Sequence, residues 1–451
     1  MIRRVVIVGA GFSGTLQAIN LLRHDGPRAL LVERAGEPGK GVAYGAAHPS
    51  HLLNVRAGNM SAFPDDPGHF TRWLEGRGVA DAASAFVPRV TYGAYLAELL
   101  EEARGRSAGR LDLVSGDVVD AVPTDDGVAV SLADGRELTA DAAVLALGNL
   151  PPHDPPGLDP TALSPDRYKG DPWEPGVADG LSDGDTVLVV GTGLTMVDMA
   201  LMLDARGFRG RIVALSRRGL LPRRHAAPAP AGDKIRERPA TVASSLVRNV
   251  RARGQVIGWR NAVDELRPFT QSMWANADEA ERARFLRHLR PWWDVHRHRL
   301  APAVADRLAA MQAGGRLQVV AGKTLAFTEH ESGVEVRWRP RGADEPQTLL
   351  VRRVINCTGP QGNLSRTGEP LLRALVERGA IRPDAARLGI DVDASAATIG
   401  ADGRPSDRLF ALGPMTRGAF WEIVAVPDIR TQTWNLARRL SNAHWVGGEG
   451  L

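Results

Sequence analysis

A strand, a glycine-rich turn and a helix occupy the first 22 residues, and this arrangement constrains the fold more than any other feature. Residues 5–8 are four consecutive β-branched residues, which is typical of a buried parallel strand. Gly9, Gly11 and Gly14 follow at G-x-G-x-x-G spacing, and residues 15–22 continue as an apolar-rich helix. The spacing suits a tight turn at Gly9, close approach of a pyrophosphate at Gly11 and close helix–strand packing at Gly14. The pattern predicts a dinucleotide-binding unit.

An acidic residue at a suitable distance supports this interpretation. A second apolar run, residues 29–32, ends at Glu33, 19 residues after Gly14, where a carboxylate can accept hydrogen bonds from a ribose. The helix that begins around Phe12 and Ser13 offers free N–H groups and a positive dipole end to phosphates. We therefore expect Phe12, Ser13 and Glu33 to bind the nucleotide together with the three glycines.

A second copy of the motif follows a second apolar strand at residues 187–190. Met196 replaces its third glycine, but the two phosphate-facing glycines are kept. The next strand, residues 211–215, ends in a serine and two arginines instead of an acid. Such donors suit a 2′-phosphate and favour NADPH over NADH, although the arginines could also simply face solvent. The residues expected to hold this nucleotide are Gly191, Gly193, Leu194, Thr195, Ser216, Arg217 and Arg218.

Two dinucleotide sites in one chain favour a permanently bound FAD and an exchanging nicotinamide nucleotide, because the two redox-active rings can then come into contact. The N-terminal site has the ribose-binding acid and lacks 2′-phosphate donors, so we assign FAD to it. Two further apolar strands end at Gly148 and at Gly359, each after a predicted hairpin (residues 127–138 and 333–351). Each strand returns the chain to a nucleotide site, where glycine permits close contact.

The predicted fold class is α/β, with two Rossmann-like dinucleotide-binding domains and a helical insert. Residues 1–154 form the first part of the FAD domain, residues 155–362 the NAD(P)H domain, and residues 363–451 the C-terminal part of the FAD domain. The insert spans about residues 222–315. Its apolar pattern at residues 285–300 crosses Pro291, which predicts two helices or one kinked helix.

Composition excludes several other classes of protein. The formal charge of +4 is a small difference between 56 basic and 52 acidic residues, so we expect neither nucleic acid nor membrane as a partner. No stretch reaches the roughly 18 apolar residues of a membrane span, and we expect no signal peptide. A cytoplasmic enzyme is predicted, with its oligomeric state open.

The single cysteine, Cys357, lies in an apolar strand and is expected to be an inert buried thiol. Flavoproteins that reduce disulfides need a redox-active cysteine pair, which this chain lacks. No cysteine or histidine cluster predicts a metal site. Electrons must then pass to oxygen, to a small substrate or to another protein.

At several motifs the sequence resembles the bacterial FAD-NAD(P)-binding proteins related to class B flavin monooxygenases. These include N-hydroxylating enzymes that act on amino acids such as aspartate, and many members without an assigned reaction. The resemblance also accounts for Met196. The matching motifs lie at residues 41–45, 51–55, 60–67, 191–198, 216–222, 285–294, 412–418, 421–422 and 426–430.

The resemblance implies further site residues. The Gly413 segment is expected to run beneath the pyrophosphate and ribitol of the flavin cofactor, and the helix after Trp421 to point at the flavin N1–O2 edge. Asn54 is expected near the isoalloxazine, although an asparagine that forms a turn is an equal alternative. Arginine is the natural clamp for a substrate carboxylate. The expected catalytic residues are Asn54, Arg297 and Arg417, with Arg290 and Arg299 as further arginines of the same kind.

Together these features predict an FAD-dependent monooxygenase that uses NADPH and O₂ to oxidise the nitrogen of a small amino acid or amine. The Baeyer–Villiger signature is absent, so nitrogen oxidation ranks above ester formation. The alternatives are an NAD(P)H-dependent flavin reductase or dehydrogenase that inserts no oxygen, and a flavin-bound sensor without turnover.

Overall fold

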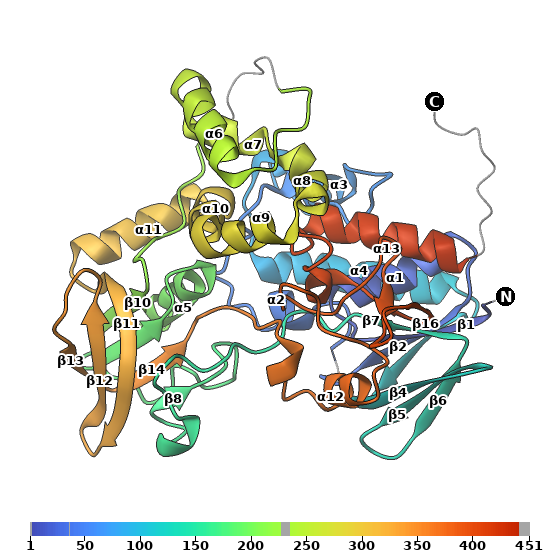
Figure 1. Cartoon of the computed structure of the whole chain (residues 1–451), viewed down its shortest axis with the longest axis horizontal. Helices are drawn as coiled ribbons and strands as arrows, with labels where there is room; N and C mark the ends of the chain where they lie inside the picture. The colour runs from blue at the N-terminus through green and yellow to red at the C-terminus, as the bar shows by residue number, and fades with distance from the viewer. Residues whose placement is uncertain (1, 36, 227–234, 442–451) are drawn as a thin grey trace. The chain divides into compact units, whose positions relative to one another are not determined.

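The chain folds into two compact units (Figure 1). The computed structural model describes residues 2–35, 37–226 and 235–441. The first unit comprises Met1–Gly45, Arg56–Asn149 and Gly362–Leu451, and the second comprises Ala46–Val55 and Leu150–Gln361. Each unit is built on its own mainly parallel sheet, as the predicted α/β class requires.

The first unit contains a six-stranded sheet in the order β15-β16-β7-β1-β2-β3. All pairs are parallel except β15 with β16. Helices α1 and α13 pack against each other along their length, and α4 lies against α1 (Figure 1). The strands are β1 (Arg4–Val8), β2 (Arg28–Glu33), β3 (Leu111–Ser115), β7 (Ala142–Leu145), β15 (Ala397–Ile399) and β16 (Pro405–Ala411); the helices are α1 (Phe12–Arg23), α2 (Gly41–Gly45), α3 (His69–Glu75), α4 (Arg89–Arg106), α12 (Pro370–Glu377) and α13 (Val426–Leu440).

Strand β1 is central because its side chains are apolar on both faces. Residues 5–8 are buried, at 0–5% exposure, between β2 and β7. A parallel strand covered on both faces reads as a continuous Val/Ile run, which is the pattern seen in the sequence. A separate antiparallel sheet, β4 (Val118–Thr124), β5 (Gly127–Leu132) and β6 (Glu137–Ala140), contains the predicted hairpin.

The second unit contains a seven-stranded sheet in the order β13-β12-β11-β10-β9-β14-β8. Strands β8 to β11 and β14 pair in parallel, and β11, β12 and β13 form an antiparallel meander. Helix α5 (Leu194–Ala205) follows β9 directly. The strands are β8 (Tyr168–Lys169), β9 (Thr186–Val190), β10 (Arg211–Ser216), β11 (Leu317–His330), β12 (Gly333–Pro340), β13 (Gln347–Val351) and β14 (Arg353–Asn356).

The insert between β10 and β11 is helical, as predicted. A π-helical turn (Phe285–Leu289) separates α9 from α10, and Pro291 lies in the first turn of α10, so the predicted break is confirmed. Helix α11 begins at Pro302 and ends before Gly314. The insert helices are α6 (Ala243–Ile257), α7 (Trp259–Asp264), α8 (Thr270–Asn276), α9 (Glu279–Arg284), α10 (Arg290–Arg297) and α11 (Pro302–Ala313).

Candidate functional site

The first glycine-rich turn joins β1 to α1 in the first unit. Gly9 has φ +97°, and a Cβ atom there would lie 2.6 Å from the Ala146 carbonyl oxygen. A Cβ at Gly14 would collide with the carbonyl oxygen of Gly9. These two glycines are therefore required by the fold itself, in the turn and packing roles predicted for them.

Gly11 differs because the protein does not need a glycine there. Its φ is −71°, which any residue adopts, and an added Cβ would meet only the Gly41 Cα, at an ordinary 3.6 Å. Gly11 precedes the first turn of α1, where helix N–H groups lack partners within the helix. The space that a side chain would fill is the space that a pyrophosphate needs to approach the backbone, so the turn fits a dinucleotide.

The Glu33 carboxylate lies at the end of β2 and is tied to the same turn. Its Oε2 accepts a hydrogen bond from the Ala10 N–H at 2.8 Å, and its Oε1 accepts one from the Ala35 N–H at 3.0 Å. Each carboxylate oxygen has a second lone pair that remains for a ribose hydroxyl. The backbone thus holds Glu33 in place beside the phosphate-binding turn.

The Gly413 turn packs onto the start of α1. Gly413 has φ +73°, and a Cβ there would collide with the Ser13 hydroxyl. Gln432 on α13 holds the turn: its Oε1 accepts from the Gly413 N–H at 2.8 Å, and its Nε2 donates to the Thr416 hydroxyl at 3.1 Å. Sequence reasoning missed Gln432 because its partner lies 19 residues away, across a loop that no local pattern marks.

Two residues expected near the flavin lie just after this turn. The Arg417 guanidinium stacks over the Trp421 ring at 4.2 Å, and Trp421 is buried at 3% exposure. A stacked, half-buried arginine keeps its charge but has a fixed direction. Gly148, three residues after the end of β7, has φ +69° with nothing within 4 Å of its Cβ position.

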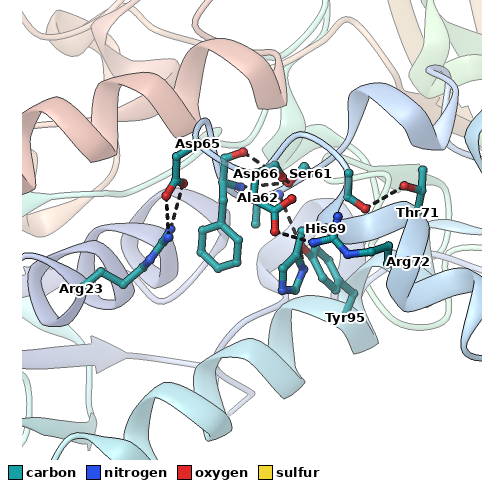
Figure 2. A network of polar contacts seen from close by, with 11 residues as sticks. Arg23, Ser61, Ala62, Asp65, Asp66, His69, Thr71, Arg72 and Tyr95 are labelled. Atoms are coloured by element: carbon teal, nitrogen blue, oxygen red, sulfur yellow. Dashed lines mark hydrogen bonds and ion pairs between the residues drawn. The ribbon is translucent and has the colours of Figure 1, made fainter. Parts of the chain in front are cut away.

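The segment at residues 60–67 is anchored to the helices of the first unit (Figure 2). Arg23 on α1 pairs with Asp65 at 2.8 Å, as Figure 2 shows. The Tyr95 hydroxyl on α4 accepts from a backbone N–H of the segment at 3.4 Å and shares a hydrogen bond with His69 Nδ1 at 2.9 Å. Burial lowers the pKa of His69, so the imidazole is neutral near neutral pH. In the sequence, only the family resemblance marks this segment.

The second glycine-rich turn has the same geometry in the second unit. Gly191 has φ +124°, and a Cβ there would collide with the Cys357 carbonyl oxygen. Gly193 has φ −85° with nothing within 4 Å of its Cβ position, so this position, like Gly11, leaves room for a phosphate. Leu194 and Thr195 begin α5 and are half-buried, and Met196 is fully buried. Gly359, with φ +94°, also faces open space.

The end of β10 carries the residues expected to select NADPH. Ser216 shares a hydrogen bond with the Thr192 hydroxyl at 2.8 Å and accepts one from the Gly219 N–H at 3.0 Å, so it braces the turn. Arg217 is exposed and Arg218 is half-buried, and neither guanidinium has a hydrogen bond or ion pair among the described residues. Both charges are therefore available to an anion.

Asn54 belongs to the segment Ala46–Val55, which packs with the second unit. Its carbonyl oxygen accepts from His225 Nε2 at 2.9 Å, and His51 Nε2 lies 2.9 Å from the Asp198 carbonyl oxygen on α5. His51 Nδ1 accepts from a backbone N–H at 3.1 Å, so the ring is held as the neutral Nε2–H tautomer. The sequence had suggested that this segment continues the FAD domain.

The arginines of the insert divide into two groups. Arg299 is buried at 4% exposure and makes two hydrogen bonds of 2.9 Å to Asp264, and Arg290 pairs with Asp294 at 3.5 Å. Arg299 is thus placed in a buried ion pair, the structural alternative to a substrate clamp, whereas the Arg290 pair is half-exposed and its role as a clamp stays a prediction. Arg297 lies half-buried in the last turn of α10.

The described residues were also compared with the requirements of metal binding, thiol chemistry and membrane insertion. No group of three or more His, Cys, Asp and Glu side chains is placed to hold a metal ion among these residues. Cys357 is buried, and burial raises the pKa of its thiol, so it is protonated and unreactive, as predicted. Within the described ranges, no helix has the length and apolarity to cross a membrane.

Comparisons with known proteins agree with this geometry. Residues 6–150 match the family model described as FAD-NAD(P)-binding, which identifies them as an FAD-NAD(P)-binding domain. No protein of curated function matches the sequence. The matched range includes the first glycine-rich turn and Glu33.

Solved structures share the fold over nearly the whole chain. L-lysine 6-monooxygenase from Pseudomonas syringae has a TM-score of 0.67 at 16% identity, covering 98% of this chain and 99% of that one. The Kutzneria sp. 744 ornithine N-hydroxylase, solved with reduced FAD, NADP⁺ and L-ornithine, has a TM-score of 0.63 at 15% identity, with the same coverage. Thioredoxin reductase from T. acidophilum follows at 0.54 and 14%, again with 98% and 99% covered. The chain has the two-domain fold of FAD- and NAD(P)H-dependent oxidoreductases.

Proposed function

We propose that this protein is an FAD-dependent monooxygenase that uses NADPH and O₂ to oxidise the nitrogen of a small amino acid or amine. The observation that carries the proposal is a pair of glycine-rich turns, at Gly11 and Gly193, where the fold does not require glycine but a pyrophosphate does. Bound FAD supplies hydride acceptance from NADPH and reaction of the reduced ring with O₂.

In this proposal, residues of the first unit bind FAD and residues of the second unit bind NADPH. In the first unit, the N–H groups at Phe12 and Ser13 face the pyrophosphate, and Glu33 orients a ribose. In the second unit, Gly193 and the start of α5 bind the NADPH pyrophosphate in the same way. Arg218 and the more exposed Arg217 bind the 2′-phosphate through charge-assisted hydrogen bonds.

Arginine side chains support the proposed substrate class. Arg417, stacked on Trp421, and Arg297, in the last turn of α10, are the arginines proposed to bind a carboxylate of the substrate, because the guanidinium fork matches a carboxylate. We assign Asn54 a hydrogen bond to the flavin or nicotinamide amide groups. Cys357 takes no electrons because its buried thiol has no second cysteine in the chain, which separates this protein from disulfide reductases of the same fold.

Anaerobic stopped-flow reduction by NADPH and by NADH, followed by mixing with oxygenated buffer, tests the proposal. A monooxygenase gives fast reduction by NADPH and then a long-lived spectrum unlike that of oxidised or reduced flavin, without prompt release of hydrogen peroxide. Substrate amines such as aspartate, ornithine and lysine are then screened for a hydroxylamine product. Fast reduction with immediate peroxide release, with or without these amines, would instead indicate a reductase. Slow reduction by both nucleotides would indicate a sensor.

A further inference from the structure

Two hydroxyl groups connect the second glycine-rich turn to the end of β10. Thr192, between the two phosphate-facing glycines of that turn, is buried at 6% exposure, and Ser216 is the last residue of β10. Their hydroxyl oxygens lie 2.8 Å apart, and the Thr192 hydroxyl donates to the Leu220 carbonyl oxygen at 2.6 Å. These contacts join segments that are 24 and 28 residues apart in the sequence.

The number of protons fixes the direction of each of these hydrogen bonds. A hydroxyl group has one proton to donate and two lone pairs that accept. Thr192 gives its proton to the Leu220 carbonyl oxygen, because a carbonyl oxygen only accepts. The Ser216 proton must therefore go to the Thr192 oxygen, and the Ser216 oxygen in turn accepts from the Gly219 N–H at 3.0 Å. The bonds thus form one directed chain from the Gly219 N–H to the Leu220 carbonyl, in which the proton of Ser216 is already used.

This chain of hydrogen bonds encloses the two arginines that follow β10. The bond from the Gly219 N–H closes a turn whose central residues are Arg217 and Arg218. Gly219 has φ +59°, and a Cβ atom there would lie 3.2 Å from a side chain of β11, so the turn also rests against the sheet. The backbone that carries both arginines is consequently held at its start by Ser216 and at its end by Leu220.

We propose that Thr192 and Ser216 are positioning residues that set the nucleotide preference of the second unit. The inference rests on the function proposed above, in which the two arginines bind the 2′-phosphate of NADPH and the glycine-rich turn binds its pyrophosphate. The hydroxyl pair holds these two anion-binding segments in a fixed relation, so that a nucleotide with both groups contacts both segments without rearranging the backbone. Ser216 does not itself donate to the 2′-phosphate, because its only proton goes to Thr192. This role differs from the direct contact that the sequence suggested for Ser216.

Binding of NADP⁺ and of NAD⁺ to the purified, FAD-loaded protein, measured by isothermal titration calorimetry, tests the proposal without turnover. Thr192→Val keeps the branched shape of the side chain and removes its hydroxyl, and Ser216→Ala removes the other hydroxyl. We expect each variant to raise the ratio of the Kd for NADP⁺ to the Kd for NAD⁺ by about 3- to 10-fold, the effect of one hydrogen bond. The double variant should show the same change as either single variant, because both substitutions break one chain of bonds.

Two control variants separate positioning from a general loss of stability. Thr192→Ser keeps the hydroxyl and should keep the original ratio of the two Kd values. Thr324→Val is the matched control, because Thr324 is another buried threonine of the second unit, and its hydroxyl donates to the Pro156 carbonyl oxygen at 2.7 Å. Thr324→Val should lower the melting midpoint about as much as Thr192→Val does, yet leave the ratio of the two Kd values unchanged.

The contrary results are distinct from one another. Equal weakening of NADP⁺ and NAD⁺ binding in Thr192→Val overturns the inference, because the hydroxyl would then only shape the turn. A loss confined to Ser216→Ala, or additive losses in the double variant, overturns it in favour of a direct contact between Ser216 and the phosphate. If Arg218→Ala raises the ratio of the two Kd values and Thr192→Val does not, only the positioning role fails. If Arg218→Ala also leaves the ratio unchanged, the proposed 2′-phosphate site fails with it.

Discussion

Replacing Arg218 and Arg217 separately, and together, tests how the second nucleotide is recognised. Neither guanidinium has a hydrogen bond or ion pair among the described residues, so truncating either side chain to alanine breaks no such bond of the fold. Arg218 is half-buried, where a charge-assisted hydrogen bond to phosphate contributes about 1.5–3 kcal/mol. Arg217 is exposed, so solvent screening reduces its share to about 1 kcal/mol or less.

These energies convert directly into nucleotide preference, since each 1.4 kcal/mol is about tenfold. We expect Arg218→Ala to lower the ratio of kcat/KM for NADPH to that for NADH by about 10- to 100-fold, and Arg217→Ala to lower it by up to about fivefold. The double variant should approach the product of the two effects. The assay is NAD(P)H oxidation at limiting nucleotide, with reduction of the bound flavin followed anaerobically.

Arg211→Ala is the matched control, because Arg211 lies at the opposite end of the same strand and already bonds to Gln318. Its nucleotide preference should equal that of the unaltered protein. The reasoning is refuted if the double variant keeps the original NADPH-to-NADH ratio, or if activities with NADPH and NADH fall equally. The arginines would then be solvent-facing residues without a role in selection.

Three further predictions follow from particular side chains. Gly11→Ala should fold with an unchanged apoprotein melting midpoint yet purify colourless, because its Cβ fits the protein but occupies the pyrophosphate space; retained yellow colour contradicts the FAD assignment. Asp204→Asn should destabilise the second unit by about 3 kcal/mol in urea titrations, since three arginines share this buried carboxylate, whereas Asp179→Asn, at an exposed pair, should cost under about 0.5 kcal/mol. Burial opposes ionisation of Asp204, but its arginine hydrogen bonds hold its pKa below the usual 3.8. The difference in unfolding free energy between the unaltered protein and Asp204→Asn should therefore persist down to about pH 5 and shrink only below pH 3.8. The Cys357 thiol should not react with a disulfide reagent until the protein unfolds, and prompt reaction in the native state would show it to be accessible.

The sequence by itself determined the local units of this protein. The two strand–turn–helix motifs, the acid at Glu33 and the break around Pro291 each depend on residues within about 20 positions of one another. Glycine spacing, β-branched runs and proline positions act through backbone sterics and short-range hydrogen bonds. These effects are local, so they can be predicted from the sequence without knowing which distant residues pack nearby. The inert Cys357 followed from the count of cysteines and its apolar neighbours.

Only the tertiary structure decided which side chains remain available. Arg299 was a reasonable carboxylate clamp until Asp264, 35 residues away, was found to hold it. The distinction between Gly9, which the fold requires, and Gly11, which it does not, rests on a carbonyl oxygen that β7 brings to the turn. The buried Asn20 on α1 donates a hydrogen bond to Thr433 on α13, 413 positions away, so its partner is known only from the fold. Whether a polar side chain is already hydrogen-bonded depends on neighbours that are distant in the sequence, and no local sequence pattern reveals those neighbours.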